Sequence, residues 1–460
     1  MQQRNTPDVP ARAMRPARDH CLAPARTADV LAGGGRYTRL FPELPPLEVH
    51  PELIQALGRA NGRCDSAALV RGESRTVAAG WPVFGQYVAH DTTADRSPVT
   101  HHDDVELLRN VRSARLDLEI LYGDGPVANP YLYSRSDPAK LLLGTNDRGE
   151  PADLPRNPEG VALAGDPRQD VHLLISQLQV AMIRAHNRLV DRLRADGVTE
   201  ADLFEEARRS LTWHYQWVVL RDFLPVTIGA ERTARLLEQG PRHFVRDGAV
   251  AIPLEFADAA FRYGHGQMRH RYRVQRGGPE LTLFPDLLGF RPVPAERAVD
   301  WRTLLDVPGE PPAQRARPID GSVPEALVHL PVDVTGVLAD HSQESLAVRD
   351  LMRGVATALP SGESVARRVG EEPLTPAETT LQACGWSGET PLWFYVLKEA
   401  EAREDGERLG PVGSLIVGEV LVGIIDADPR SFRSVDPEWR PTLPAREPGR
   451  FTVADLLVPA

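Results

Sequence analysis

DVHLLISQLQVAMIRAHNRLVDRLRA, residues 170–195, is the stretch that decides the fold. Its apolar residues recur at spacings of three and four, which predicts a long helix with one face in the core. The same spacing continues in EADLFEEARRSLTWHYQWVVLRDF, residues 200–223, and we expect Pro225 to end that second helix. Two long helical segments in succession indicate a core built from α-helices.

The same periodicity extends outward from these two helices. It predicts further helices over 81–92, 254–263, 344–357, 376–383, 391–404 and 412–425. The alternation typical of strands is scarce. The predicted fold class is therefore mainly α, a multi-helical single domain over 36–460 with few short strands. The proline-rich stretch VPGEPPAQRARP, residues 307–318, predicts a surface excursion within that domain.

The N-terminal end has a different composition. Residues 1–35 are rich in Arg, Pro, Ala and Gly without periodicity, which predicts a flexible leader. No apolar segment follows the basic start, so we expect no secretory signal and a cytoplasmic protein. No apolar run reaches the roughly 18 residues that a membrane span needs.

The charge and residue usage narrow the function classes. The 460 residues carry a net charge of −11, which argues against nucleic acid and against an anionic membrane surface as partners. Lys140 and Lys398 are the only lysines among 53 basic residues, a bias that indicates a GC-rich bacterial genome. Cys21, Cys64 and Cys384 lie far apart, so we expect isolated thiols and no disulfide framework or thiolate zinc site.

A first group of candidate residues lies in FGQYVAHDTTAD, residues 84–95. On a helix, Gln86 and His90 share a face, whereas Asp91 points about 100° away. A histidine with a near-neutral pKa can take up a proton and return it during a reaction. Without further context, a histidine on a half-apolar helix is more often structural.

A second candidate lies in AGDPRQD, residues 164–170, directly before the long helix. Asp166 fits the position of a helix N-cap, and Arg168 can project from the first turn. An arginine in that place can stabilise negative charge that develops in a reaction. An arginine at a helix start is, by itself, usually a surface residue.

A third group lies in AAFRYGHGQMRHRY, residues 259–272. His265 follows an apolar run, as an axial ligand entering a hydrophobic haem site should. Gly264 and Gly266 are expected to leave room for a flat macrocycle. His270 competes with His265 by residue type, but it is surrounded by arginines in the sequence, as on a solvated face.

A fourth group lies in RSARLDLEILYG, residues 112–123. Ser113, Asp117 and Glu119 place oxygen donors at alternating positions, as in a loop that wraps a hard cation such as calcium. A polar turn is the simpler interpretation of this segment alone.

Taken in order, these four segments resemble the animal-type haem peroxidase superfamily, which includes myeloperoxidase-, peroxinectin- and cyclooxygenase-like proteins. The similarity extends from about Arg36 to Ala460 and is closest to bacterial members. It also includes GPVANPYLYSR, DLPRNPEGVAL, HNRLVDRLR, FEEARRSLTWHYQWVVLRDFLP, LPSGESVARRVG, PLWFYVLKEAE and FTVADLL. The order and spacing of these motifs carry the resemblance.

The resemblance implies a role for each candidate. His90 would be the distal acid–base histidine, with Arg168 as its catalytic partner and Gln86 as the distal glutamine that orders water or a halide. His265 would be the proximal ligand of a haem b iron. The remaining implied positions are Arg262 and Arg353 facing the haem propionates, and a calcium site made by Asp91, Ser113, the Arg115 carbonyl, Asp117 and Glu119.

The chain departs from the family pattern at three positions. Ala89 and Val171 stand where mammalian members carry the acidic residues that form ester bonds with haem, so the resemblance implies haem bound non-covalently. Asp170 lies one residue from the second of these positions. Asp350 stands where the family has an asparagine that accepts a hydrogen bond from the proximal histidine. A carboxylate accepts more strongly and would favour higher oxidation states of the iron.

Three functions remain open on this sequence. The first is a peroxidase that reduces hydrogen peroxide and oxidises a small organic donor, or possibly a halide, in an oxidative-stress or other role. The second is a cyclooxygenase-like fatty-acid dioxygenase, for which Tyr215 is a conceivable radical site. The third is a catalytically inactive haem-binding relative. The presence of His90, Arg168 and His265 together favours the first.

Overall fold

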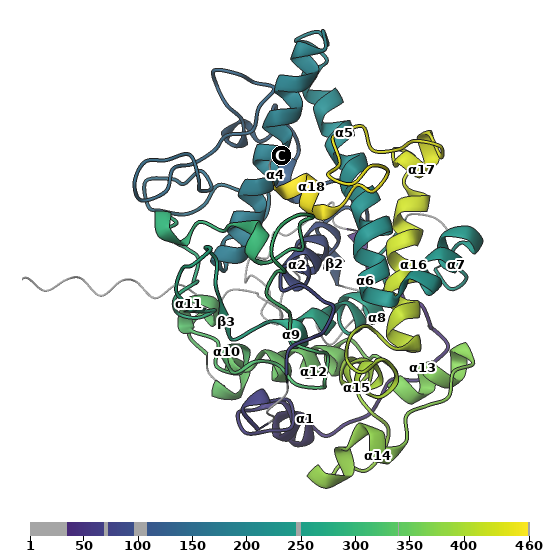
Figure 1. Ribbon diagram of the computed structural model, residues 1–460. Coiled ribbons are helices and arrows are strands. Elements are labelled where there is room, and N and C mark those ends of the chain that lie inside the picture. Colours follow the sequence, from purple (N-terminus) through teal and green to yellow (C-terminus); the bar gives the residue numbers. More distant parts are fainter. Residues whose placement is uncertain (1–34, 69–71, 96–107, 245–249, 339, 459–460) are drawn as a thin grey trace, which may run out of the picture.

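The computed structural model of this chain describes residues 35–68, 72–95, 108–244, 250–338 and 340–458. Helices joined by irregular segments make up this part of the chain (Figure 1). The predicted leader lies outside the described residues apart from Gly35, as does Cys21. Cys64 is buried in the core.

The helices fall into two size classes. The longer ones are α1 Pro51–Gly58, α2 Trp81–Thr92, α4 Leu173–Ala195, α5 Leu203–Val218, α7 Ala230–Gln239, α12 Leu346–Ala356, α13 Gly362–Val369, α15 Leu392–Glu404 and α16 Pro411–Ala427. The shorter ones are α3 Glu119–Tyr122, α6 Leu224–Ile228, α8 Leu254–Ala257, α9 Gly264–Gln267, α10 Glu325–Val328, α11 Val332–Thr335, α14 Pro376–Thr379, α17 Phe432–Val435 and α18 Val453–Leu457.

The strands of the described residues are short. β1 Gly35–Arg36 pairs antiparallel with β2 Arg109–Asn110, and β3 Arg271–Tyr272 pairs antiparallel with β4 Leu281–Thr282. The prediction of a mainly α protein with few short strands is therefore confirmed. None of the helices in the described part is long and apolar enough to cross a membrane.

Most of the segment 170–195 forms α4, which packs along α5 in the upper half of the molecule (Figure 1). The helix begins later than residue 170, because Asp166 first caps a short 3-10 turn over Pro167–Asp170. The imidazole of His172 then caps α4 by accepting a hydrogen bond from the Ile175 amide. The polypeptide therefore changes direction twice just before the long helix, and this double turn carries Arg168.

The expectation that Pro225 ends the second helix was wrong. After α5, a π-helical turn over Val219–Phe223 leads directly into α6, whose first turn contains Pro225. A proline lacks the amide hydrogen, but the first turn of a helix does not need it.

Two other predicted helices are broken. The segment 254–263 forms α8, an irregular pair at Asp258 and Ala259, and a 3-10 turn over Ala260–Tyr263. The segment 376–383 splits into α14 and a 3-10 turn over Leu381–Cys384. The predictions for α2, α12, α15 and α16 agree with the structure to within two residues at each end.

The proline-rich stretch 307–318 is a surface excursion only in its first half, where Pro308, Gly309, Pro311 and Pro312 are exposed. Its second half lies along the segment that precedes α2, where Ala79 donates to the Gln314 carbonyl and Ala316 donates to the Val77 carbonyl. Ala316 is fully buried. The stretch therefore helps to hold the start of α2 in the core, where α4 and α9 also pack against this helix (Figure 1).

Candidate active site

Helix α2 is buried along most of its length but leaves one strip half-exposed. Gly85, Gln86 and Ala89 are half-buried, whereas Phe84, Tyr87 and the other neighbours on the opposite side are buried. The strip lies on the side of the helix where the sequence predicts the candidate residues. It indicates open space next to α2 in the middle of the molecule.

His90 lies at the C-terminal end of this strip and is almost fully buried. Its Nδ1 atom is 3.3 Å from the side-chain oxygen of Gln169. With the amide oxygen of Gln169 facing the ring, Nδ1 donates its hydrogen and Nε2 is the nitrogen with the lone pair. This tautomer is the one that a proton acceptor needs.

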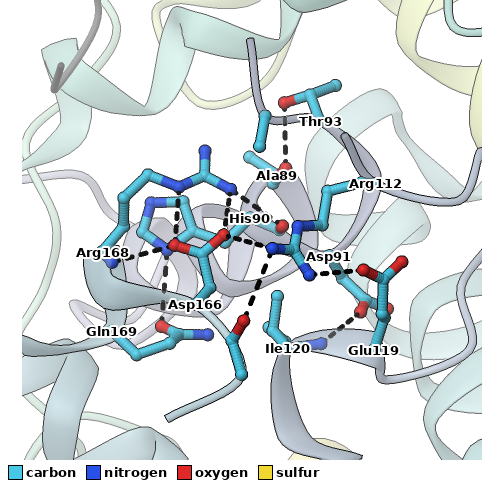
Figure 2. A network of polar contacts seen from close by, with 12 residues as sticks. Ala89, His90, Asp91, Thr93, Arg112, Glu119, Ile120, Asp166, Arg168 and Gln169 are labelled. Carbon is cyan, nitrogen blue, oxygen red and sulfur yellow. Dashed lines mark hydrogen bonds and ion pairs between the residues drawn. The ribbon is translucent and has the colours of Figure 1, made fainter. Parts of the chain in front are cut away.

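Arg168 is held beside His90 by Asp166 (Figure 2). Its Nε and Nη2 atoms donate to the two carboxylate oxygens of Asp166 at 3.0 and 2.9 Å, and Nη2 also donates to the His90 carbonyl at 3.0 Å. The Asp166 carboxylate additionally accepts the Arg168 amide hydrogen, which confirms the predicted N-cap. The bidentate contact fixes the guanidinium plane as well as its position.

A second arginine completes the surroundings of Asp166. Arg112 lies between Asp166, at 3.2 Å, and Glu119, at 2.6 Å (Figure 2). Burial alone would raise the pKa of Asp166, but the charge and hydrogen bonds of Arg168 and the charge of Arg112 hold it well below its usual range. Asp166 therefore stays ionised and keeps both arginines in place.

Gln86 is fixed by a histidine that the sequence analysis did not single out. His172 Nε2 lies 2.8 Å from the Gln86 side-chain oxygen. Because His172 Nδ1 accepts the Ile175 amide hydrogen, Nε2 must be the protonated nitrogen and donates to Gln86. Burial lowers the pKa of His172 to about 3, so the ring stays neutral. The arrangement turns the amide NH₂ group of Gln86 away from His172.

On the second side of the candidate site, His265 lies on α9, a neighbour of α2. His265 Nδ1 is 2.6 Å from one Asp350 oxygen, and Arg262 donates to the other oxygen at 3.0 Å. Asp350 is fully buried, so its charge is balanced by these two partners. The hydrogen bond orients the imidazole so that Nε2 points away from Asp350.

The expected contact between Asp350 and His265 is thus present. The side chain of His265 is 26% exposed, although α9 lies inside the molecule. A Cβ atom placed on Gly264 would meet no atom within 4 Å, as expected for a residue beside open space. Gly266 was expected to serve the same purpose, but this was wrong. A Cβ atom there would lie 3.1 Å from the Ser322 carbonyl, so Gly266 permits close packing of the chain.

Arg262 and Arg353 converge on the acidic side chain of Asp258. Arg262 Nη2 lies 3.3 Å and Arg353 Nε 3.1 Å from the same Asp258 oxygen. Arg353 also forms an ion pair with Asp95 and is 3% exposed. Both guanidinium groups therefore pair with carboxylates of the chain, and their contact with haem propionates stays a prediction.

The loop that follows the second strand brings several oxygen atoms together. Asp91 is completely buried and accepts the amide hydrogens of Leu118 and Ile120 at 3.0 and 3.4 Å. Burial, and next the charge of Asp117, raise the pKa of Asp91 well above its usual value. Ser113 Oγ donates to Asp117 at 3.1 Å. The structure therefore places Asp91, Ser113 and Asp117 in one region, as the sequence predicts.

Two expected members of this group are already engaged. Glu119 accepts hydrogen bonds from Arg112 and from the Ser113 amide. The Arg115 side chain faces Asp428, at 3.7 Å. Within the described residues, no group of three or more His, Cys, Asp and Glu side chains has a geometry suited to a metal ion.

The positions that carry ester bonds in mammalian relatives offer no free carboxylate. Ala89 and Val171 are apolar, and Val171 is buried. Neighbouring Asp170 is bound through both oxygens by Arg156, at 2.7 and 2.8 Å. The carboxylate closest in sequence to an ester position is therefore occupied by an arginine.

Sequence reasoning missed Gln169, His172, Arg112 and Asp258. Gln169 and Arg112 lie in the quoted segments without having been singled out, and each of the four contacts at least one candidate residue or its partner from another segment of the chain. The one signal available was proximity to Arg168 in the sequence, which applies to Gln169 and His172 alone.

The comparisons with known proteins concern the family and the fold. The sequence profile of the animal haem peroxidase family matches residues 100–283. The chain is 24% identical to peroxidase skpo-1 of Caenorhabditis elegans over 69% of its own length and 48% of that protein. It spans about half or less of the length of the curated relatives it matches.

Two solved structures share the fold. Peroxidase A from Dictyostelium discoideum superposes with a TM-score of 0.65 at 16% identity, over 92% of both chains. The fatty acid alpha-dioxygenase of Oryza sativa superposes with a TM-score of 0.61 at 14% identity, over 86% of this chain and 76% of that one. The chain therefore has the fold of the haem peroxidases and is similar in sequence to the animal haem peroxidase family.

His172 provides a first test of the site. Replacing His172 by Phe removes the hydrogen-bond donor that orients Gln86. The side-chain amide of Gln86 can then rotate and would no longer donate to an anion bound to the haem iron. We expect the affinity of the ferric haem protein for fluoride to fall about tenfold, the equivalent of one hydrogen bond of about 1.4 kcal/mol. Optical titration measures it. His172→Gln, which keeps a donor, should restore part of the affinity, and an unchanged fluoride affinity in His172→Phe would contradict the role.

Asp350 provides a second test. Asp350→Asn replaces the carboxylate by a weaker acceptor, so His265 becomes a poorer electron donor to iron. We expect the midpoint potential of the haem to rise on the order of 60 mV, since 59 mV corresponds to about 1.4 kcal/mol for one electron. Spectroelectrochemistry measures it. Asp196→Asn, which makes the same change at the exposed C-terminal end of α4, should leave the midpoint potential unchanged.

Proposed function

We propose that this protein is a haem-dependent peroxidase, which reduces hydrogen peroxide and oxidises a small organic donor. The observation that carries the proposal is the state of His90. Its Nδ1 atom contacts the Gln169 side chain, which orients the imidazole of a histidine that lies beside the half-exposed strip of α2, and an imidazole can act as a base. Arg168 lies beside it with a charge fixed by Asp166.

The residues present fit a haem group between α2 and α9. His265 would bind the iron through Nε2, because Nδ1 is committed to Asp350. The half-exposed His265 and the open space at Gly264 leave room for the macrocycle. When bound, haem supplies the site for peroxide cleavage and stores the two oxidising equivalents that are then passed to the donor.

The chain's own residues would move the protons and stabilise the charges. His90 Nε2 accepts the proton of the peroxide oxygen nearest to it and returns it to the oxygen that leaves as water. The Arg168 guanidinium stabilises the negative charge on that oxygen as the bond breaks. Gln86, held by His172, offers its NH₂ group to water or to an anion, which makes a halide a second candidate donor.

We further propose that the haem is bound without covalent links. Ala89 and Val171 cannot form esters, and the Asp170 carboxylate is bound by Arg156 through both oxygens. Such a bidentate contact has to be broken before the carboxylate could react. The lack of ester bonds would lower the potential of the iron compared with a doubly linked enzyme and make chloride a poorer donor.

Replacing His90 by Ala tests the main proposal. The variant loses the base, so the rate of the absorbance change after one equivalent of peroxide should fall by roughly a hundred- to ten-thousand-fold. Stopped-flow spectroscopy measures it. The Soret absorbance should show haem still bound through His265, and acid–acetone extraction of the wild-type protein should release all of its haem.

His329→Ala is the matched control, because His329 is exposed and far from the site in sequence and structure. It should react with peroxide at the wild-type rate. A wild-type rate in His90→Ala would rule out the assigned base. Protein that takes up no haem at all would rule out the function.

A calcium ion beside the distal helix forms a third part of the proposal. Asp91, Ser113 and Asp117 supply oxygen atoms in one region, the type of ligand that calcium prefers, and the Arg115 carbonyl would be a further ligand. Two carboxylates in a buried region repel each other, and a cation between them would stabilise both charges. Glu119 would contribute by holding Arg112. The ion would tie the loop to α2 and keep His90 in place.

Removing calcium tests this part. EGTA should lower the melting temperature of the haem protein by several degrees, since a ligand at a hundred times its dissociation constant stabilises by about 2.7 kcal/mol. Differential scanning fluorimetry measures it, with re-addition of calcium as the reversal. Asp91→Asn should abolish the response, while Asp124→Asn, an exposed change in a nearby turn, should keep it. A wild-type melting temperature insensitive to EGTA and calcium would contradict the site.

A fatty-acid dioxygenase activity is the second candidate, because the chain shares its fold with a plant fatty acid alpha-dioxygenase. Such an activity needs a radical-forming tyrosine beside the haem. Tyr215 is buried, but it packs against Phe84 and Tyr87 on the side of α2 away from the strip with Gln86. In this position the Tyr215 side chain would not contact a substrate at the haem. Oxygen uptake and oxygenated products with a fatty acid, in the absence of an electron donor, would establish the dioxygenase.

A further inference from the structure

A cavity of about 340 Å³ opens at the surface between α5, α16 and α17, on the far side of α5 from α2 (Figure 1). Arg221, Arg433 and Arg440 line it, together with one acidic residue, Asp426. Asp426 forms an ion pair with Arg433 at 2.6 Å. The chain as a whole carries a net charge of −11, so this concentration of positive charge is local and exceptional.

The arginines of the cavity crowd one another. Burial, then the charges of Arg433 and Arg440, lower the pKa of Arg221. Within the described residues, the Arg221 guanidinium makes no hydrogen bond or ion pair, and its recorded contact is with the Trp217 ring, at 5.6 Å. The three arginines outnumber the single acidic residue of the lining, Asp426, which pairs with Arg433. The remaining like charges repel one another, and an anion bound between them would lower that free energy. The charges therefore favour an anionic ligand.

The wall of the cavity is aromatic. Trp217 is half-buried and lies under the guanidinium groups of Arg221 and Arg440, at 5.6 and 5.7 Å from the ring centre. Phe432 lies 5.9 Å from Trp217, and Trp439 lies 6.1 Å from it. An aromatic anion would find both a charge partner and a ring surface here.

Trp217 is also the outer end of a series of oxidisable rings. On the opposite face of α5, Tyr215 packs 6.2 Å from Tyr87, which lies one helical turn before His90 on α2. Trp217 and Tyr215 are two residues apart and are separated by the width of one helix, about 10 Å. The hydroxyl groups of Tyr87 and Tyr215 are buried. The rings thus link the surface cavity to the helix that carries the distal base.

We propose that this cavity is a second donor site, which binds an anionic aromatic molecule and draws its electron through Trp217 to the oxidised haem. The inference rests on the proposed peroxidase function. In each step Trp217 gives one electron inward by way of Tyr215 and Tyr87, and the bound donor returns one electron to the Trp217 radical. Two donors are oxidised to radicals for each peroxide, which takes up two electrons and two protons to give two waters. The substrate class is a donor too large or too charged to enter the haem site.

The experiment uses the haem protein with two donors, the dianionic sulfonated dye ABTS and the small neutral phenol guaiacol. Trp217→Phe keeps the aromatic wall but removes the oxidisable indole, so the ratio of ABTS to guaiacol turnover should fall at least tenfold. In samples frozen after peroxide without donor, a tryptophan radical signal should be present in the wild type and absent in Trp217→Phe. Electron paramagnetic resonance detects this signal independently of turnover.

The binding half is tested without peroxide. Isothermal titration calorimetry should show ABTS binding that weakens at least tenfold in Arg221→Glu. Arg135→Glu, the same charge change at an exposed position outside the cavity, should bind ABTS like the wild type. Equal weakening in both variants would overturn the site, because the attraction would then be due to overall charge.

An unchanged donor ratio and an unchanged radical signal in Trp217→Phe would overturn the electron path. A wild-type protein whose haem spectrum does not respond to peroxide would refute the peroxidase function, and with it the electron path. Loss of the path with a normal peroxide response would refute this inference alone, so the two failures are distinguishable.

Discussion

The buried carboxylate of Asp166 is the constraint on which the candidate site depends. It caps the turn that carries Arg168, binds the Arg168 guanidinium through both oxygens, and attracts Arg112 from a different segment. A buried anion is stable only when its partners stay in place. The turn before α4, the guanidinium beside His90 and the loop with Arg112 are therefore coupled through one side chain. Loss of that charge would release all three.

The same principle operates on the other side of the site. Asp350 holds the ring of His265 and is itself held by Arg262, which also contacts Asp258. The irregular residues between α8 and the following 3-10 turn bring Asp258 into this position. In both halves, a buried carboxylate fixes a functional residue, and an arginine supplies the balancing charge. Positions on separate segments are thereby locked together by electrostatics in an interior of low dielectric constant.

The two faces of helix α5 have different surroundings. Helix α5 presents Tyr215 towards the core behind α2 and Trp217 towards a cavity rich in arginine. A protein with an excess of acidic residues would repel anionic molecules in general. At the cavity, the cluster of arginines would attract anionic molecules instead. The two proposed donor sites therefore differ in charge, one between α2 and α9 for a small donor and one at the arginine-rich cavity for an anionic aromatic donor.

The sequence by itself determined the helical class, because apolar spacing reports which face of a helix is buried, and it gave α2, α12, α15 and α16 nearly to the residue. Through the family resemblance of its motifs it also predicted His90, Arg168, His265 and Asp350 as site residues. The same resemblance grouped Asp91 with Ser113 and Asp117, which lie in one region of the structure.

The hydrogen bonds and ion pairs that keep these side chains in position were decided by the tertiary structure alone. The pairing of His172 with Gln86, of Arg112 with Asp166 and of Arg156 with Asp170 joins segments that no local pattern connects. Three features were missed because each depends on packing partners elsewhere in the chain: the continuation of the helix past Pro225, the break at Asp258 and the packing of 313–318 against the segment before α2. Periodicity measures burial along one segment, whereas hydrogen bonds and ion pairs between segments depend on how the whole chain packs.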